Sequence, residues 1–169
     1  LGYGAIGKLI EERLKGFGVE TTAVRRTPGH GTLGPDEWRG KLATFDWVIL
    51  AVPATPETEK MIGEAELSFM KSSATLVNIA RGTVVDQDAL VAALRDGQIG
   101  AAFLDVTDPE PLPAGHPLWS LDNAHITMHL SGRAQTLMFK RAGQRFLENL
   151  AHYREGANLL HSVDLTLGY

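Results

Sequence analysis

The 169-residue sequence predicts an α/β protein in which a parallel sheet is doubly wound, with helices on both faces in three layers. Short runs of apolar and β-branched residues recur along the chain, and segments with a helical pattern lie between them. This alternation is typical of parallel sheets, because each parallel crossover needs a connection long enough to hold a helix. A glycine motif at the start of the chain supports the same fold class.

The glycine motif is Gly2-Tyr3-Gly4-Ala5-Ile6-Gly7, and it opens a predicted helix over residues 6–15. In a strand-to-helix turn with the pattern G-x-G-x-x-G, the first glycine permits a tight turn and the second lets the backbone approach a pyrophosphate. The third lets the helix pack on the strand. The N–H groups at the helix start then face the phosphates. We interpret the motif as the dinucleotide site of a Rossmann-type fold, with a purely structural glycine turn as the alternative.

The other elements follow from hydrophobic pattern and from breakers. Strands are expected where apolar, β-branched residues cluster: residues 19–24, 45–52, 74–79, 99–106 and 124–128. Helical segments are expected at residues 36–42, 57–70, 86–96 and 132–154, the second of them interrupted at Gly63. Glycines and prolines assign residues 27–33 and 107–119 to loops.

Only Leu1 precedes the glycine motif, although the fold calls for a strand of about five residues before that turn. We therefore expect the first strand to be truncated and the chain to be part of a longer protein. Residues 1–157 are predicted to form a dinucleotide-binding domain, and residues 158–169 are predicted to form an extended tail.

Composition argues against several classes of function. The formal net charge of -4 offers no electrostatic basis for binding nucleic acid or an anionic membrane. No apolar run approaches the roughly 20 residues of a membrane span. The chain has no cysteine, hence no disulfide or zinc–thiolate site, and we predict no metal site of any kind. A cytoplasmic location is the default expectation.

The choice of cofactor is predicted from the end of the second strand. In dinucleotide sites an acidic residue about 20 positions after the glycines binds the adenosine ribose. Arg25 and Arg26 stand at this position instead. An arginine pairs with a 2′-phosphate through charge-assisted hydrogen bonds, whereas an acid would repel it. The sequence therefore favours NADP over NAD, with a solvated basic pair as the alternative.

Four motifs then follow in a fixed order: Val52-Pro53-Ala54-Thr55-Pro56-Glu57-Thr58, Asn78-Ile79-Ala80-Arg81-Gly82, Asp105-Val106-Thr107-Asp108-Pro109-Glu110-Pro111 and His125-Ile126-Thr127-Met128-His129. In this order they resemble the cofactor domain of the D-isomer-specific 2-hydroxyacid dehydrogenases. That family includes glyoxylate and hydroxypyruvate reductases, phosphoglycerate dehydrogenases and formate dehydrogenases. The resemblance covers nearly the whole chain and implies hydride transfer between NAD(P)H and a small 2-keto or 2-hydroxy acid.

The resemblance also implies a catalytic trio of Arg81, Glu110 and His129. Arg81 follows a predicted strand, and its planar guanidinium suits the carboxylate of a substrate. His129 follows the last strand, and a histidine exchanges its proton near neutral pH. Glu110 is the carboxylate that orients this histidine. Each residue could by itself be an exposed structural group, but all three are expected at the same edge of the sheet.

Cofactor contacts are expected along the same edge. Besides the glycine motif and the two arginines, the implied set comprises Val52, Pro53, Thr58, Ile79, Ala80, Arg81, Asp105, His129 and Ser131.

The chain departs from the family pattern in two respects. Met128 stands where the family commonly has proline before the active histidine. The family's substrate-binding domain precedes the glycine motif, and residues 163–169 resemble the segment that returns to it. We therefore expect the isolated chain to bind cofactor without turnover.

A homodimer formed through this domain is expected. A non-catalytic dinucleotide sensor or dimerisation module of the same fold is the alternative function.

Overall fold

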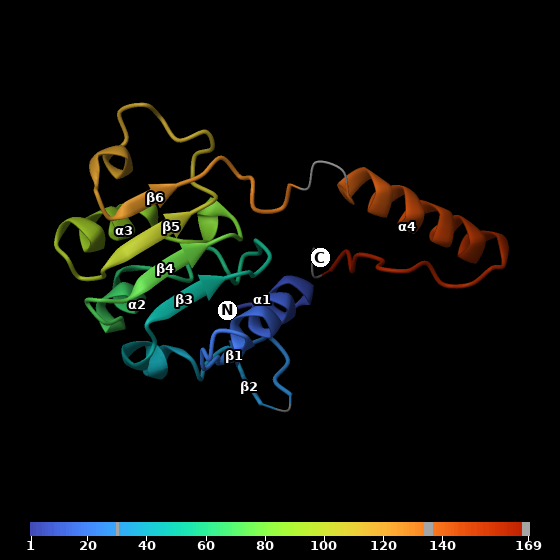
Figure 1. Ribbon diagram of the computed structural model, residues 1–169, viewed down its shortest axis with the longest axis horizontal. Helices are drawn as coiled ribbons and strands as arrows, with labels where there is room; N and C mark the ends of the chain where they lie inside the picture. The colour runs from blue at the N-terminus through green and yellow to red at the C-terminus, as the bar shows by residue number, and fades with distance from the viewer. Residues whose placement is uncertain (30, 134–136, 167–169) are drawn as a thin grey trace. The chain divides into compact units, whose positions relative to one another are not determined.

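The computed structural model describes residues 1–29, 31–133 and 137–166 (Figure 1). Its elements occur in this order: α1 (Ala5–Lys15), β1 (Ala23–Val24), β2 (Thr32–Leu33), the 3₁₀ helix η1 (Arg39–Thr44), β3 (Trp47–Leu50), α2 (Glu64–Phe69), β4 (Thr75–Asn78), η2 (Gly82–Val84), α3 (Gln87–Arg95), β5 (Ala101–Leu104), η3 (Pro117–Ser120), β6 (Ala124–Ile126) and α4 (Leu137–Arg154).

The sheet is parallel throughout the described residues, as the alternation of strands and helices predicts. Strands β3, β4, β5 and β6 lie side by side in sequence order, and β1 pairs with β2 in a separate two-stranded ladder. Leu1 joins the two ladders. Its nitrogen donates to the Ile49 oxygen at 2.6 Å and its own oxygen accepts from Ala51 N at 2.8 Å, while Gly2 N donates to the Val24 oxygen at 3.0 Å on the other side. The resulting order, β2-β1-Leu1-β3-β4-β5-β6, is that of a doubly wound nucleotide-binding sheet.

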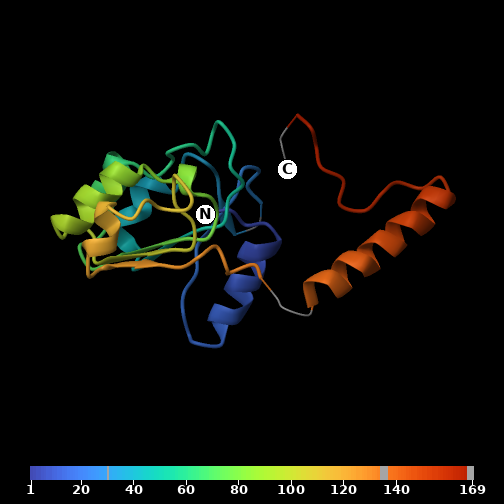
Figure 2. The same ribbon diagram turned by 90° about the horizontal axis from the view of Figure 1, so that it is seen from above.

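The hydrophobic core lies between the four-stranded sheet and helices α2 and α3. Figure 2 shows the sheet nearly edge-on, with both helices on one face and α1 toward the other side. Alternate residues of each strand point to opposite faces, so Leu50, Leu76 and Ala102 are fully buried beneath the helices. The opposite face carries Trp47 and Phe103, which are half exposed and whose rings stack at 6.4 Å.

Several predicted elements are shorter than the sequence pattern suggests. The strand expected over residues 19–24 contains only Ala23–Val24, and the loop predicted over residues 27–33 ends in the unexpected strand β2. The helix expected over residues 57–70 is confined to Glu64–Phe69. It begins after Gly63 because the Glu66 carboxylate accepts a hydrogen bond from Gly63 N at 3.1 Å.

Residues Leu130–Tyr169 form a second compact unit, separate from the unit Leu1–His129. The predicted start of the last helix at residue 132 is wrong, because Gly132 and Arg133 are not helical. Helix α4 is described from Leu137. After α4 the chain turns back along it, because the Asn149 side chain binds both the N–H and the oxygen of Leu160, at 2.7 and 3.2 Å.

The predicted domain boundary at residue 157 stays a prediction. None of the described helices is both long and apolar enough to cross a membrane.

Candidate active site

The predicted site residues of the first unit lie just beyond the carboxyl ends of parallel strands. Arg25 follows β1, Val52 follows β3, Arg81 follows β4, Asp105 follows β5 and His129 follows β6. Because these strands run in the same direction, their carboxyl ends meet at one edge of the sheet. Ligands of open α/β sheets bind at this edge, where the strand order reverses.

The three glycines of the motif meet different constraints. Gly2 has a φ of +91°, and a Cβ there would lie 2.4 Å from the Ala51 oxygen; a Cβ on Gly7 would lie 2.3 Å from the Gly2 oxygen. Packing alone therefore requires both glycines. Gly4 is the N-cap of the 11-residue helix α1. Unlike at Gly2 and Gly7, a Cβ on Gly4 would meet no protein atom within 4 Å.

The open space at Gly4 lies where the N–H groups of the first helical turn lack helical partners. A phosphate can approach this backbone closely only because residue 4 is a glycine and has no side chain in the way. The residues of the loop thus fit a pyrophosphate, with Tyr3, Ala5 and Ile6 supplying neighbouring backbone.

Tyr3 ties the glycine loop to the middle of α1. Its hydroxyl donates to Glu11 Oε2, and Glu11 also accepts from Thr21 Oγ1 at 3.3 Å. The hydrogen bond from Tyr3 is the main reason that the pKa of Glu11 is lowered, and the same bond raises the pKa of the Tyr3 phenol. The loop, the helix and the segment that precedes β1 are therefore held together by one carboxylate.

The two arginines after β1 have different surroundings. Both are exposed, but Arg26 Nη2 lies 3.6 Å from Glu57 Oε2, on the loop after β3. The backbone N–H of Arg25 donates to the Leu33 oxygen at 3.0 Å, which fixes the start of its side chain against β2. A 2′-phosphate near Arg26 would compete with Glu57, so Arg25 is the stronger candidate for that contact.

The loop after β3 is organised by one threonine. Thr58 Oγ1 donates to the Pro53 oxygen at 2.7 Å and accepts from Thr55 N at 2.8 Å. Val52 and Thr58 are partly buried and Pro53 is exposed. These contacts shape the turn that carries three of the predicted cofactor residues, and the contacts of those residues with a cofactor stay predictions.

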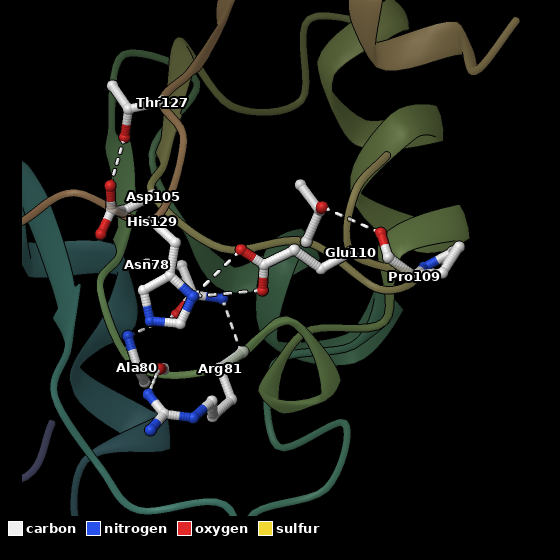
Figure 3. A network of polar contacts seen from close by, with 9 residues as sticks. Asn78, Ala80, Arg81, Asp105, Pro109, Glu110, Thr127 and His129 are labelled. Atoms are coloured by element: carbon white, nitrogen blue, oxygen red, sulfur yellow. Dashed lines mark hydrogen bonds and ion pairs between the residues drawn. The ribbon is translucent and has the colours of Figure 1, made fainter. Parts of the chain in front are cut away.

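Asn78 sets the conformation of the segment that carries Arg81. Its buried side chain accepts from Ala80 N at 3.0 Å and donates to the Arg81 oxygen at 2.9 Å (Figure 3). Ile79 remains attached to the sheet through a hydrogen bond from its N–H to the Leu50 oxygen at 3.3 Å. Arg81 is exposed, and its Nη1 donates to the Ala80 oxygen at 2.6 Å, which leaves other N–H groups of the planar guanidinium to bind an anion.

Asp105 and Thr127 fix the backbone from which His129 projects. Thr127 Oγ1 donates to the buried Asp105 carboxylate. The backbone N–H of His129 donates to the backbone carbonyl oxygen of Asp105 at 2.9 Å. His129 has a φ of +52°, in the left-handed region that few residues other than glycine adopt. Such backbone strain is concentrated at functional sites.

The His129 ring faces the Glu110 carboxylate (Figure 3). Nδ1 lies 3.0 Å from Oε1 and 3.2 Å from Oε2, and both side chains are about half exposed, at 45% and 40%. An ionised carboxylate only accepts hydrogen bonds, so Nδ1 must carry a proton in this pair. The opposite nitrogen, Nε2, can then give a proton to a bound molecule or take one from it.

Asn78 and Thr127 are functional candidates that the sequence interpretation did not assign. Asn78 ends an otherwise apolar buried strand, and a buried amide at such a point must find hydrogen-bond partners. That polar residue could have been found from the sequence. Thr127 carries no comparable signal, because its partner Asp105 is 22 residues away.

A cavity of about 440 Å³ lies beside Leu1, between β1 and β3. Its lining includes Gly2, Tyr3 and Gly7 of the glycine motif, but not Arg81, Glu110 or His129. The cavity lies in the part of the sheet where Leu1 connects β1 with β3 through hydrogen bonds. Ser131 belongs to the second unit, and its predicted cofactor contact stays a prediction.

Comparison with known proteins agrees with this arrangement. Residues 1–131 match the family described as D-isomer specific 2-hydroxyacid dehydrogenase, NAD binding domain. The chain is 38% identical to the glyoxylate reductase of Korarchaeum cryptofilum, covering 92% of this chain and 48% of that protein. It is 38% identical to the human glyoxylate reductase/hydroxypyruvate reductase, covering 89% and 48%.

Among solved structures, the chain is similar to a D-isomer specific 2-hydroxyacid dehydrogenase from Xanthobacter autotrophicus Py2 in complex with NADPH and MES. The TM-score is 0.91 at 36% identity, over 99% of this chain and 70% of that one. The chain spans about half the length of the curated relatives it matches. The chain belongs to the D-isomer specific 2-hydroxyacid dehydrogenase family, whose NAD-binding domain it contains.

Proposed function

We propose that this chain is the cofactor-binding part of a reductase that acts on small 2-keto acids, similar to glyoxylate and hydroxypyruvate reductases. The observation that carries the proposal is the Glu110–His129 pair at 3.0 Å, at the sheet edge that also carries Arg81 and the glycine loop. A proton donor and an anion-binding group together are what reduction of a 2-keto acid requires. The names of the relatives support this substrate class.

When bound, NAD(P)H supplies a hydride to the carbonyl carbon. Protonated His129 gives the proton on Nε2 to the carbonyl oxygen as negative charge develops there. Glu110 holds the ring by its other nitrogen and stabilises the imidazolium. Arg81 binds the substrate carboxylate and aligns the carbonyl with the hydride donor. The product is a 2-hydroxy acid, and the histidine regains a proton from solvent.

NADP is the cofactor that we propose for this site. Arg25 follows β1 where an acid would serve NAD, and the similar Xanthobacter structure contains NADPH. We also propose that the protein acts as a homodimer. The second unit supports this with exposed apolar side chains along α4, among them Phe139, Phe146 and Leu147. A cytoplasmic location stays a prediction.

The proposed activity is tested with the full-length protein that contains this chain. Purified protein should oxidise NADPH when glyoxylate or hydroxypyruvate is added. Arg81→Ala should raise KM and lower kcat together, because the carboxylate anchor also orients the reacting carbonyl. Lys41→Ala, an exposed change in η1 far from the sheet edge, serves as the control. NADPH binding without turnover of any 2-keto acid would favour the non-catalytic sensor instead.

A further inference from the structure

Gln87, the first residue of α3, joins that helix to the loop that carries Glu110. Its Nε2 donates to the Asp108 oxygen at 2.7 Å, and its Oε1 accepts from Asp108 N at 3.1 Å. Both polar ends of one amide thus bind both backbone groups of one residue, which fixes the position and the orientation of Asp108. The same Nε2 lies 3.2 Å from Nε2 of His116.

Glu110 lies between two fixed points of its loop. Asp108 is the first, held by Gln87 two residues before Glu110. Leu112 is the second, and it is buried in the core two residues after Glu110. Thr107 Oγ1 also donates to the Pro109 oxygen at 3.0 Å, so the backbone between these points is turned in a defined way. The direction of the Glu110 side chain therefore depends on where Asp108 is held.

The start of α3 and the segment after Arg81 both contact the loop that carries Glu110. Asp86 caps α3 by accepting from Ala89 N at 3.2 Å, which fixes the start of the helix. A Cβ on Gly82 would lie 2.0 Å from the Thr107 oxygen, so the Arg81 turn and the loop are in direct backbone contact. Gly82 and Gln87 thus hold the same loop at neighbouring residues, Thr107 and Asp108, just before the carboxylate that faces His129.

We propose that Gln87 is a positioning residue that holds Glu110 against Nδ1 of His129 through the backbone of Asp108. The consequences for catalysis rest on the proposed function, whereas the consequences for the His129 ring do not. Without the two hydrogen bonds the loop can shift between its remaining anchors, and the carboxylate then faces the ring for only part of the time. Gln87 itself touches no substrate or cofactor in this role.

The kinetic test compares Gln87→Met with wild type in the full-length protein. Methionine keeps the length of the side chain but removes both hydrogen bonds. We expect kcat/KM to fall roughly tenfold, the equivalent of one to two hydrogen bonds. We measure kcat/KM across pH for Glu110→Gln and Gln87→Met, and we expect both variants to change the pH–rate profile in the same way. Because both act on one pair, the double variant should be no worse than Glu110→Gln alone.

Three further variants separate this role from a general loss of structure. Gln98→Met makes the same chemical change just beyond the other end of α3 and should leave the profile in place. His116→Gln removes the titratable ring near Gln87 and should not reproduce the change in the profile. Gln87→Glu keeps an acceptor for Asp108 N but faces the Asp108 oxygen with a second acceptor, so it should fail to rescue.

The structural test reads the His129 ring directly by ¹⁵N NMR of histidine-labelled full-length protein, with His129→Gln used for assignment. The neutral ring should be protonated on Nδ1 in wild type, and this tautomer should be depleted in both Gln87→Met and Glu110→Gln. The inference is wrong if Gln87→Met lowers thermal stability but leaves both the tautomer and the pH–rate profile unchanged. If wild type reduces no 2-keto acid, the proposed function fails, and the tautomer measurement still decides the role of Gln87.

Discussion

The sheet has two sides in strand order, β3–β6 on one side of Leu1 and β1–β2 on the other, and they differ in how much of the chain packs against them. On one side, β3–β6 are four adjacent strands whose buried residues pack against α2 and α3. On the other, β1 and β2 have two residues each, α1 buries none of its residues, and a cavity of about 440 Å³ lies beside Leu1. The proposed catalytic residues Arg81, Glu110 and His129 belong to the first side, and the glycine loop and Arg25 belong to the second.

This difference suggests that the two sides respond differently to change. The proposed catalytic groups are held by side-chain hydrogen bonds anchored in a packed core, so we expect their substitution to alter chemistry without altering the fold. The glycine loop depends on backbone contacts with few packed neighbours. Changes there should be expressed as altered cofactor binding or stability.

The largest effect is expected at His129. His129→Ala in the full-length protein should lower kcat/KM for a 2-keto acid by about 10²–10⁴, the usual contribution of a positioned acid. NADPH affinity should change less than the rate, because His129 is one of many proposed cofactor contacts, most of which lie in the glycine loop and after β3. Steady-state kinetics and a fluorescence titration of NADPH measure the two quantities. Near-normal turnover would remove His129 from the role of acid.

Two glycine substitutions should separate packing from ligand approach. Gly7→Ala places a Cβ 2.3 Å from the Gly2 oxygen and should lower the free energy of unfolding by about 3 kcal/mol, at the upper end of overpacking costs. Gly4→Ala meets no protein atom and should fold normally, yet it should weaken NADPH binding. Urea unfolding and calorimetric titration provide the measurements. If Gly4→Ala binds NADPH as tightly as wild type, the pyrophosphate does not approach this backbone.

The smallest effect is expected at Arg25. Arg25→Asp should weaken NADPH binding by about 1–3 kcal/mol through loss of a charge-assisted contact, and it should leave NADH binding nearly unchanged. Arg26→Asp should cost less, because Arg26 already faces Glu57 at 3.6 Å. Calorimetric titration of both cofactors into both variants makes the comparison. Equal affinity of wild type for NADH and NADPH would show that neither arginine selects the cofactor.

Local pattern in the sequence was sufficient for the main layout of the protein. Apolar runs predicted β3, β4, β5 and β6, since a buried parallel strand must be apolar on both faces. The glycine motif predicted the turn into α1, because only glycine meets the packing at Gly2 and Gly7. Parallel direction alone then brings Arg81 and His129 to the same edge of the sheet.

Other features depend on contacts between residues far apart in the chain, which local pattern does not contain. The pairing of β2 with β1 stabilises a strand in a segment whose glycines and proline predict a loop. The hydrogen bonds from Thr127 to Asp105 and from Gln87 to Asp108 span 22 and 21 residues. A hydrogen bond requires distance and direction to be right at once, and only the folded backbone sets both. The sequence by itself therefore determined which residues reach the site, and the tertiary structure decided how they are held there.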